Sequence, residues 1–275
     1  MEGGRKRRTA LPQHTQRVTA APVCEGNQAT VGGQMRYLLV VDRDGNERFT
    51  MSMLLQRFGY TVASTSSASE AIDFLCVAPA DAVFVEAGET GDDLTERLQG
   101  DARFKGVPVV MVTESPDRSL EARLRKDELA GLLRKPLDPD DVFLVIQKVI
   151  EKGTRRNIRI PTVLPAVLHT RTGVSDGYVT VLSQFGMFFR SLEPLSVKMR
   201  ATVEIPLWSR NVIIEAEVLY SVTFEEGPFC EPGMGMKFTK IEPEDSVLIK
   251  HYIYEQLGME IGRIVPGKGP AAGQA

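Results

Sequence analysis

Hydrophobic positions follow two different patterns along the chain, and the change falls near residue 153. Between residues 37 and 151, short continuous apolar runs alternate with segments whose apolar residues recur at helical spacing. The runs, which are typical of buried parallel strands, cover 38–41, 61–63, 82–85, 107–112 and 131–133. The helical segments cover 47–58, 70–77, 92–98, 120–129 and 138–151. Five such strand–helix units predict a doubly wound parallel α/β sheet.

Beyond residue 153 the apolar runs are short, rich in β-formers and separated by Gly and Pro about every ten residues. The clearest of them cover 178–181, 186–189, 201–205 and 212–216. This spacing predicts a small all-β barrel or sandwich, followed by an amphipathic helix over 244–257. Upstream, Asp138 and Pro139 provide an N-cap and a first-turn proline for the last helix of the α/β part.

These patterns divide the chain into four segments. Residues 1–34, rich in Gly, Gln, Thr and Pro, lack a hydrophobic period and are expected to be a disordered tail. Residues 35–151 form the α/β domain, and 152–260 form the β domain with its helix. Residues 261–275, rich in Gly, Pro and Ala, are expected to be a second disordered tail. Met35 directly precedes the first strand and is a candidate start of translation.

Composition narrows the class of protein. With 43% hydrophobic and 25% charged residues among 275, the chain is typical of a globular protein, and its formal net charge of -3 gives no general attraction to nucleic acid. The three cysteines are far apart and without a CxxC spacing, which favours reduced thiols. No apolar run has the length of a membrane span, and no hydrophobic segment follows the basic start. We therefore expect a cytoplasmic protein that neither inserts into a membrane nor binds nucleic acid.

Functional sites in doubly wound folds lie at the carboxyl ends of the strands, and in this chain polar residues occupy those ends. Asp42 and Arg43 end the first strand and Glu86 ends the third. Thr113 ends the fourth, and Lys135, followed by a proline, ends the fifth. In this order the residues resemble the two-component receiver domain, a flavodoxin-like fold, over about residues 36 to 150. That family has an acidic pair, a phosphoacceptor Asp, a Ser or Thr, and a Lys-Pro at these positions.

Two departures from the receiver pattern predict that this site is not phosphorylated. Glu86 stands at the acceptor position, where its carboxylate lies one methylene further out than the family's Asp. Arg43 stands where the family supplies a Mg²⁺ ligand, and a guanidinium offers only hydrogen-bond donors. A side-chain ion pair of Glu86 with Lys135 or Arg43 is expected to replace the metal and phosphate. Two interpretations stay open: a receiver locked in one state, or a decayed site that only maintains the fold.

A second group of residues opens the β domain. Arg155, Arg156 and Arg159 form a basic segment, and paired guanidinium forks can bind a phosphate or the edge of a guanine. Together with Ser183, Gly186 and a Gly-Met-Gly-Met-Lys-Phe run at 233–238, this segment resembles the PilZ domain, a β-barrel family that binds cyclic di-GMP. The resemblance covers about residues 153 to 258 and includes its RxxxR signature.

The second PilZ motif, (D/N)xSxxG, is incomplete. Ser183 and Gly186 are in place, but Val181 occupies the position of the Asp or Asn that contacts guanine in the family. Losing one polar partner costs about 1 to 3 kcal/mol, which weakens binding roughly ten- to hundredfold. The arginines either still bind cyclic di-GMP or are ordinary charges after a helix, and both interpretations remain.

Two functions follow from these resemblances. The first is a non-enzymatic bacterial signalling adaptor that recruits unidentified signalling or motility proteins and requires no cofactor. The second is a cyclic di-GMP receptor in which Arg155 and Arg159 wrap the ligand and reorient the two domains. An enzyme is not expected, because the three histidines are scattered and no metal-ligand spacing or phosphate-binding glycine loop is present.

Overall fold

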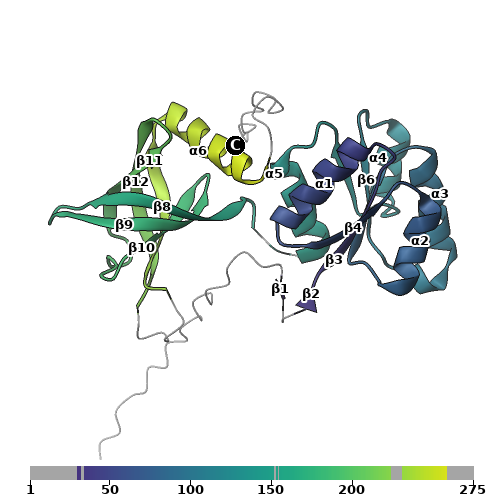
Figure 1. Ribbon diagram of the computed structural model, residues 1–275, viewed down its shortest axis with the longest axis horizontal. Coiled ribbons are helices and arrows are strands. Elements are labelled where there is room, and N and C mark those ends of the chain that lie inside the picture. Colours follow the sequence, from purple (N-terminus) through teal and green to yellow (C-terminus); the bar gives the residue numbers. More distant parts are fainter. Residues whose placement is uncertain (1–29, 32–33, 152, 154, 224–230, 259–275) are drawn as a thin grey trace, which may run out of the picture.

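The computed structural model describes residues 30–31, 34–151, 153, 155–223 and 231–258. Two domains follow one another along the chain (Figure 1). The first has a five-stranded parallel sheet in the order β4-β3-β5-β6-β7, which is the doubly wound α/β fold predicted from the apolar runs. Its strands are β3 (Tyr37–Val41), β4 (Thr61–Thr65), β5 (Ala82–Glu86), β6 (Val109–Thr113) and β7 (Gly131–Arg134).

Helices cover both faces of this sheet. They are α1 (Gly45–Arg57), α2 (Ala68–Val77), α3 (Glu89–Gly100), α4 (Arg118–Arg125) and α5 (Pro139–Ile146), with a 3-10 turn, η1 (Ala102–Phe104), before β6. Leu54 of α1 and Val142 of α5 share one hydrophobic cluster with Phe84, whereas Leu75 of α2 and Leu94 of α3 belong to the other. Alternate residues of each strand point to opposite faces, so a strand buried on both sides is apolar throughout.

The start of α5 forms as the sequence predicts, but its end differs. Asp138 is the N-cap, accepting a hydrogen bond from the backbone N–H of Asp140, and Pro139 lies in the first turn. The α-helical hydrogen bonding ends at Ile146, and residues Gln147–Glu151 continue as a π-helical turn, η2. Here the Tyr60 hydroxyl donates to Glu151 Oε1 at 2.7 Å, which ties the end of the helix to the start of β4.

The second domain is a closed antiparallel barrel in the order β10-β13-β12-β11-β8-β9, as the all-β pattern predicts. Its strands are β8 (Arg159–His169), β9 (Val174–Ser183), β10 (Gly186–Arg190), β11 (Arg200–Leu207), β12 (Arg210–Val222) and β13 (Gly233–Ile241). Several strands are longer than the apolar runs from which they were predicted. Strand β8 in particular includes Pro161 and Pro165, and its pairing with β9 shifts register between Pro161 and Leu164. A register shift accommodates proline in a sheet because the ladder is interrupted there.

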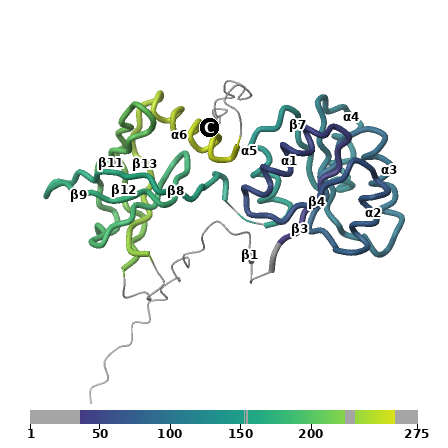
Figure 2. The backbone as a smooth tube through the Cα atoms, in the orientation of Figure 1, coloured from purple at the N-terminus to yellow at the C-terminus, as the bar shows by residue number. Residues whose placement is uncertain are grey.

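The terminal helix α6 (Pro243–Gln256) lies between the barrel and α5 of the first domain (Figures 1 and 2). Ile249 and Ile253 of this helix, and Leu257 directly after it, are buried in a cluster that also contains side chains of α1 and of the barrel interior. The two domains are therefore joined by a continuous apolar contact as well as by the linker. No helix in the described part of the chain is long and apolar enough to cross a membrane.

The terminal segments lie mostly outside the described residues. Within the stretch expected to be a disordered tail, Thr30–Val31 (β1) and Gln34–Met35 (β2) pair as a short antiparallel ladder. The rest of residues 1–34, and all of residues 261–275, lie outside the described part, so the expectations for them stay predictions.

Candidate functional site

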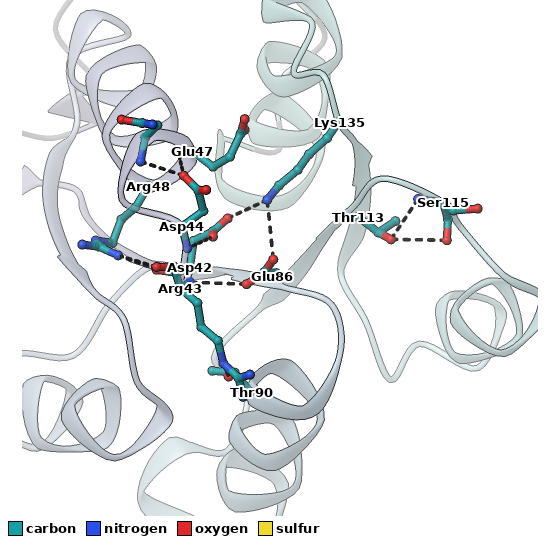
Figure 3. Close-up of polar contacts among 11 residues, drawn as sticks. Asp42, Arg43, Asp44, Glu47, Arg48, Glu86, Thr90, Thr113, Ser115 and Lys135 are labelled. Atoms are coloured by element: carbon teal, nitrogen blue, oxygen red, sulfur yellow. Dashed lines mark hydrogen bonds and ion pairs between the residues drawn. The ribbon is translucent and has the colours of Figure 1, made fainter.

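The carboxyl ends of β3, β5 and β7 bring three charged residues together in the first domain (Figure 3). Asp42 is buried, and its Oδ2 lies 2.9 Å from Nζ of Lys135. The same ammonium lies 3.8 Å from Oε1 of Glu86, a longer and more exposed contact. These three side chains, with Phe84 and Leu137, line a small pocket at the edge of the sheet. Lys135 therefore occupies the centre of the site as an internal cation.

The charge of Lys135 is stabilised by its surroundings. Burial by itself lowers the pKa of this ammonium, but the hydrogen bond to Asp42 and the charges of Asp42 and Glu86 outweigh it, so the pKa is raised above its ordinary value of 10.5. The Lys135 and Asp42 side chains are only 9% and 7% exposed, which makes them a desolvated pair rather than a surface salt bridge.

The backbone of Arg43 contacts Glu86 in the site, whereas its side chain contacts helix α3. Its backbone N–H donates to Oε2 of Glu86 at 3.3 Å. Its guanidinium donates through Nε to Oγ1 of Thr90 at 2.6 Å and through Nη2 to Oε2 of Glu89 at 3.3 Å, both on α3. The expected ion pair between Arg43 and Glu86 is thus not formed, because the side chain extends along α3. The pair of Glu86 with Lys135 is present.

These contacts do not suit the Mg²⁺ that receivers bind. Mg²⁺ requires several oxygen ligands in octahedral geometry. Asp42 already accepts the Lys135 ammonium on Oδ2 and the backbone N–H of Asp44 on Oδ1. Arg43 adds no oxygen from its side chain, because its guanidinium is a donor only and is directed to Thr90 and Glu89. The residues present therefore do not fit this metal.

Thr113, the fourth residue of the receiver pattern, is directed away from Glu86 (Figure 3). Its hydroxyl accepts from the backbone N–H of Ser115 at 3.2 Å and lies 3.3 Å from the Ser115 carbonyl oxygen. The structure thus groups Asp42, Glu86 and Lys135 with the backbone of Arg43 and leaves Thr113 at the margin. Sequence reasoning missed Thr90 and Glu89, because their role depends on where α3 lies relative to the first strand.

In the barrel, three residues of the PilZ pattern meet at one end of β9. Arg159, the first residue of β8, is paired with Ser183, the last residue of β9. The Ser183 hydroxyl is buried and donates to the carbonyl oxygen of Gly186 at 2.9 Å, which closes the turn into β10. A Cβ on Gly186 would lie 2.6 Å from the carbonyl oxygen of Met236 on β13, so only glycine fits there. Ser183 and Gly186 therefore have structural tasks that do not depend on a ligand.

Arg155 and Arg156 of the basic segment, and Val181, which replaces the Asp or Asn of the second PilZ motif, lie on or next to strands β8 and β9. Arg155 and Arg156 are exposed in the connection that precedes β8. Val181 is half-buried and pairs with Pro161 of β8 and Phe188 of β10. Its side chain presents only apolar atoms to the surface that Arg159 and Ser183 border. The geometry thus supplies guanidinium donors without the polar group of the family's second motif.

The fold and these sites define a receiver domain joined to a PilZ barrel. Comparison with protein families agrees: residues 38–147 match the response regulator receiver domain, and residues 153–255 match the PilZ domain. The chain therefore contains a receiver domain followed by a PilZ domain.

Three similar proteins each match less than half of this chain. The two-component response regulator ORR6 of Oryza sativa subsp. japonica is 24% identical over 119 residues, which are 41% of this chain and 70% of the relative. ORR3 of Oryza sativa subsp. indica is 27% identical over 120 residues, 42% of this chain and 92% of the relative. Among solved structures, the Vibrio cholerae chemotaxis protein CheY4 is 24% identical and covers 42% of this chain and 99% of its own, with a TM-score of 0.40.

Proposed function

We propose that this protein is a non-enzymatic signalling adaptor, in which a pseudo-receiver and a divergent PilZ barrel act through contacts with other proteins. The observation that carries the proposal is the direction of the Arg43 guanidinium, which donates to Thr90 and Glu89 and provides no oxygen ligand beside Asp42, while Glu86 occupies the acceptor position. Lys135 offsets part of the negative charge of Asp42 and Glu86, which line the pocket together with Glu47. The site thus contains an ion-pair cluster but lacks one of the metal ligands of the family.

The chemistry of the acceptor position supports the same conclusion. Covalent phosphorylation requires a carboxylate that attacks the phosphorus atom while a metal neutralises the transferring group. Glu86 is held by the backbone N–H of Arg43 and by Lys135. A guanidinium at position 43 does not replace a metal ligand. Glu86 moves the attacking carboxylate away from the acceptor position, and Arg43 removes a ligand of the metal. Each change lowers the reactivity toward a phosphoryl donor.

Restoration of the family's residues tests this proposal. Wild-type protein, Glu86→Asp and the double variant Arg43→Asp/Glu86→Asp are incubated with acetyl phosphate and Mg²⁺ and examined by intact-mass spectrometry. We expect a phosphoryl adduct in the double variant and none in the wild type. Glu86→Asp alone, which restores the acceptor without the missing metal ligand, is the control. An adduct on wild-type Glu86 at a comparable rate contradicts the proposal.

A cyclic di-GMP receptor is the second candidate, favoured by the exposed Arg159 that pairs with Ser183 at the end of β9. In this function Arg155 and Arg159 hold the ligand, and its binding reorients the domains. Calorimetric titration of wild type, Arg155→Ala and Val181→Asp distinguishes the candidates. Binding that Arg155→Ala abolishes favours the receptor, whereas binding that appears only in Val181→Asp favours the adaptor, which requires no cofactor.

The process served is proposed by association with the two domain families rather than from the site. We place the adaptor in the bacterial cytoplasm, in the control of motility or cell polarity, with signalling or motility proteins as partners. Affinity capture with the full chain, compared with a variant that disrupts one domain surface, tests that assignment.

A further inference from the structure

Helix α6 of the PilZ domain makes polar contacts with the first turn of α5 in the receiver domain. Tyr254 of α6 is 2% exposed, and its hydroxyl lies 2.8 Å from Oδ1 of Asp138 and 2.8 Å from Oδ2 of Asp140. Lys250, one turn earlier on α6, places Nζ 3.1 Å from the same Oδ2 of Asp140. Its ammonium also lies 5.0 Å from the centre of the Tyr254 ring. Two side chains of one domain thus hold two carboxylates of the other.

The protonation state of Tyr254 suits this contact. Burial, and then the charges of Asp140 and Asp138, raise the pKa of the phenol, so the hydroxyl keeps its proton and remains a donor. The atom that accepts this hydroxyl, Oδ1 of Asp138, also accepts the backbone N–H of Asp140 as the N-cap of α5. The hydrogen bond that begins α5 and the hydrogen bond that joins the domains therefore share an atom.

The segment that ends at this N-cap, residues 135–138, also lines the receiver pocket. Asp138 follows Lys135 by three residues, and Leu137 between them is buried and lines the pocket together with Lys135. A change in the position of Lys135 relative to Asp42 and Glu86 must therefore be accommodated within this short segment. The N-cap of α5 at Asp138 lies three residues further along this segment, so such a change is passed toward it.

We infer that the Tyr254–Asp138–Asp140 contact, which we call the α6 latch, couples the receiver pocket to the PilZ barrel. The partner on which this receiver acts is then the helix α6 of its own chain. The inference does not depend on phosphorylation or on cyclic di-GMP, since it concerns how the two domains are held together. It also sets a condition for any reorientation of the domains, because the latch must open first.

Hydrogen exchange of the full chain tests the latch. Tyr254→Phe keeps the ring and removes the hydroxyl, which leaves two carboxylates without their shared donor. Because a hydrogen bond to a charged group is stronger than one between neutral groups, its loss should favour local opening. We expect amides in 138–146 and 243–256 to exchange at least about tenfold faster in Tyr254→Phe than in the wild type. Tyr252→Phe on the same helix, whose ring packs against Trp208 of the barrel, is the matched control. Equal exchange in the two variants would overturn the latch.

A double-mutant cycle tests the coupling. Lys135 and Tyr254 have no shared side-chain partner, so independent sites would give unfolding constants that multiply to within about twofold. We expect the double variant Lys135→Met/Tyr254→Phe to depart from that product by at least about fivefold. The pair Lys135→Met with Tyr252→Phe should multiply as independent sites do. If both pairs multiply in the same way, the pocket and the latch are not coupled, whatever the outcome of the phosphorylation and cyclic di-GMP experiments.

Discussion

Replacing Lys135 by methionine should destabilise the receiver domain through the charge that it leaves behind. Methionine keeps most of the apolar stem, so the packing around Leu137 and Phe84 changes little. The lost interaction is the pair with Asp42, whose two side chains are 9% and 7% exposed. Glu86 adds little, because its contact is 3.8 Å long and its side chain is 32% exposed.

The magnitude follows from burial. Removing one partner of a buried ion pair costs about 3–5 kcal/mol, because the other charge is left without compensation. Asp42 keeps the hydrogen bond from the backbone N–H of Asp44 at 2.9 Å, so we expect the lower end, about 3 kcal/mol. Neutralising both partners in Asp42→Asn/Lys135→Met should restore most of that stability, since no buried charge remains.

Urea denaturation of the full chain, followed by far-ultraviolet circular dichroism, measures these differences in unfolding free energy. Arg123→Met is the control: it removes the pair with Asp92, whose side chain is 62% exposed, and a 3.8 Å contact with Glu128, and it should cost less than about 1 kcal/mol. If Lys135→Met is no more destabilising than Arg123→Met, or if the double variant is no more stable than Lys135→Met, the view of Asp42 as a buried charge held by Lys135 is wrong.

Three further predictions concern pH, packing and capping. The pKa of Lys135 is raised in the folded protein, so its contribution to stability is complete below pH 10.5 and is lost as the pH rises through the folded pKa. In denaturation experiments at increasing alkaline pH, the wild type should therefore lose stability relative to Lys135→Met. Gly235→Ala should destabilise the barrel by about 1–3 kcal/mol, because a Cβ there would overlap the Tyr220 ring. Thermal unfolding should show partial recovery in Gly235→Ala/Tyr220→Ala. Asp117→Ala should cost about 1 kcal/mol by removing the N-cap of α4, whereas Asp117→Asn should be nearly neutral in the same assay.

The order of elements was predictable because each part of the chain obeys a local rule. Buried parallel strands are apolar throughout, and a capping residue followed by proline marks a helix start, as at Asp138. The barrel strands were harder to delimit. Register shifts between Phe188 and Phe189 and between Val218 and Tyr220 interrupt the alternation on which sequence patterns depend.

The site was predictable in its members but not in its contacts. The ends of parallel strands must meet, so Asp42, Glu86 and Lys135 could be grouped from sequence. The direction of the Arg43 side chain could not, because its partner Thr90 is 47 residues away and its position depends on how α3 packs. The contact between Tyr254 and α5 depends on packing between domains, and no pattern within either domain indicates it.

If the receiver pocket is an ion-pair cluster that cannot take a phosphoryl group, the wild-type protein should not bind a phosphoryl analogue there. An amide NMR titration of the full chain with Mg²⁺ and beryllofluoride, an analogue of a phosphoryl group on a carboxylate, measures this directly. We expect no saturable shift at Asp42, Glu86, Thr113 or Lys135 in the wild type, and saturable shifts in Arg43→Asp/Glu86→Asp. Saturable shifts at these residues in the wild type would show that the pocket still accepts the phosphoryl analogue, and the proposed pseudo-receiver would be wrong.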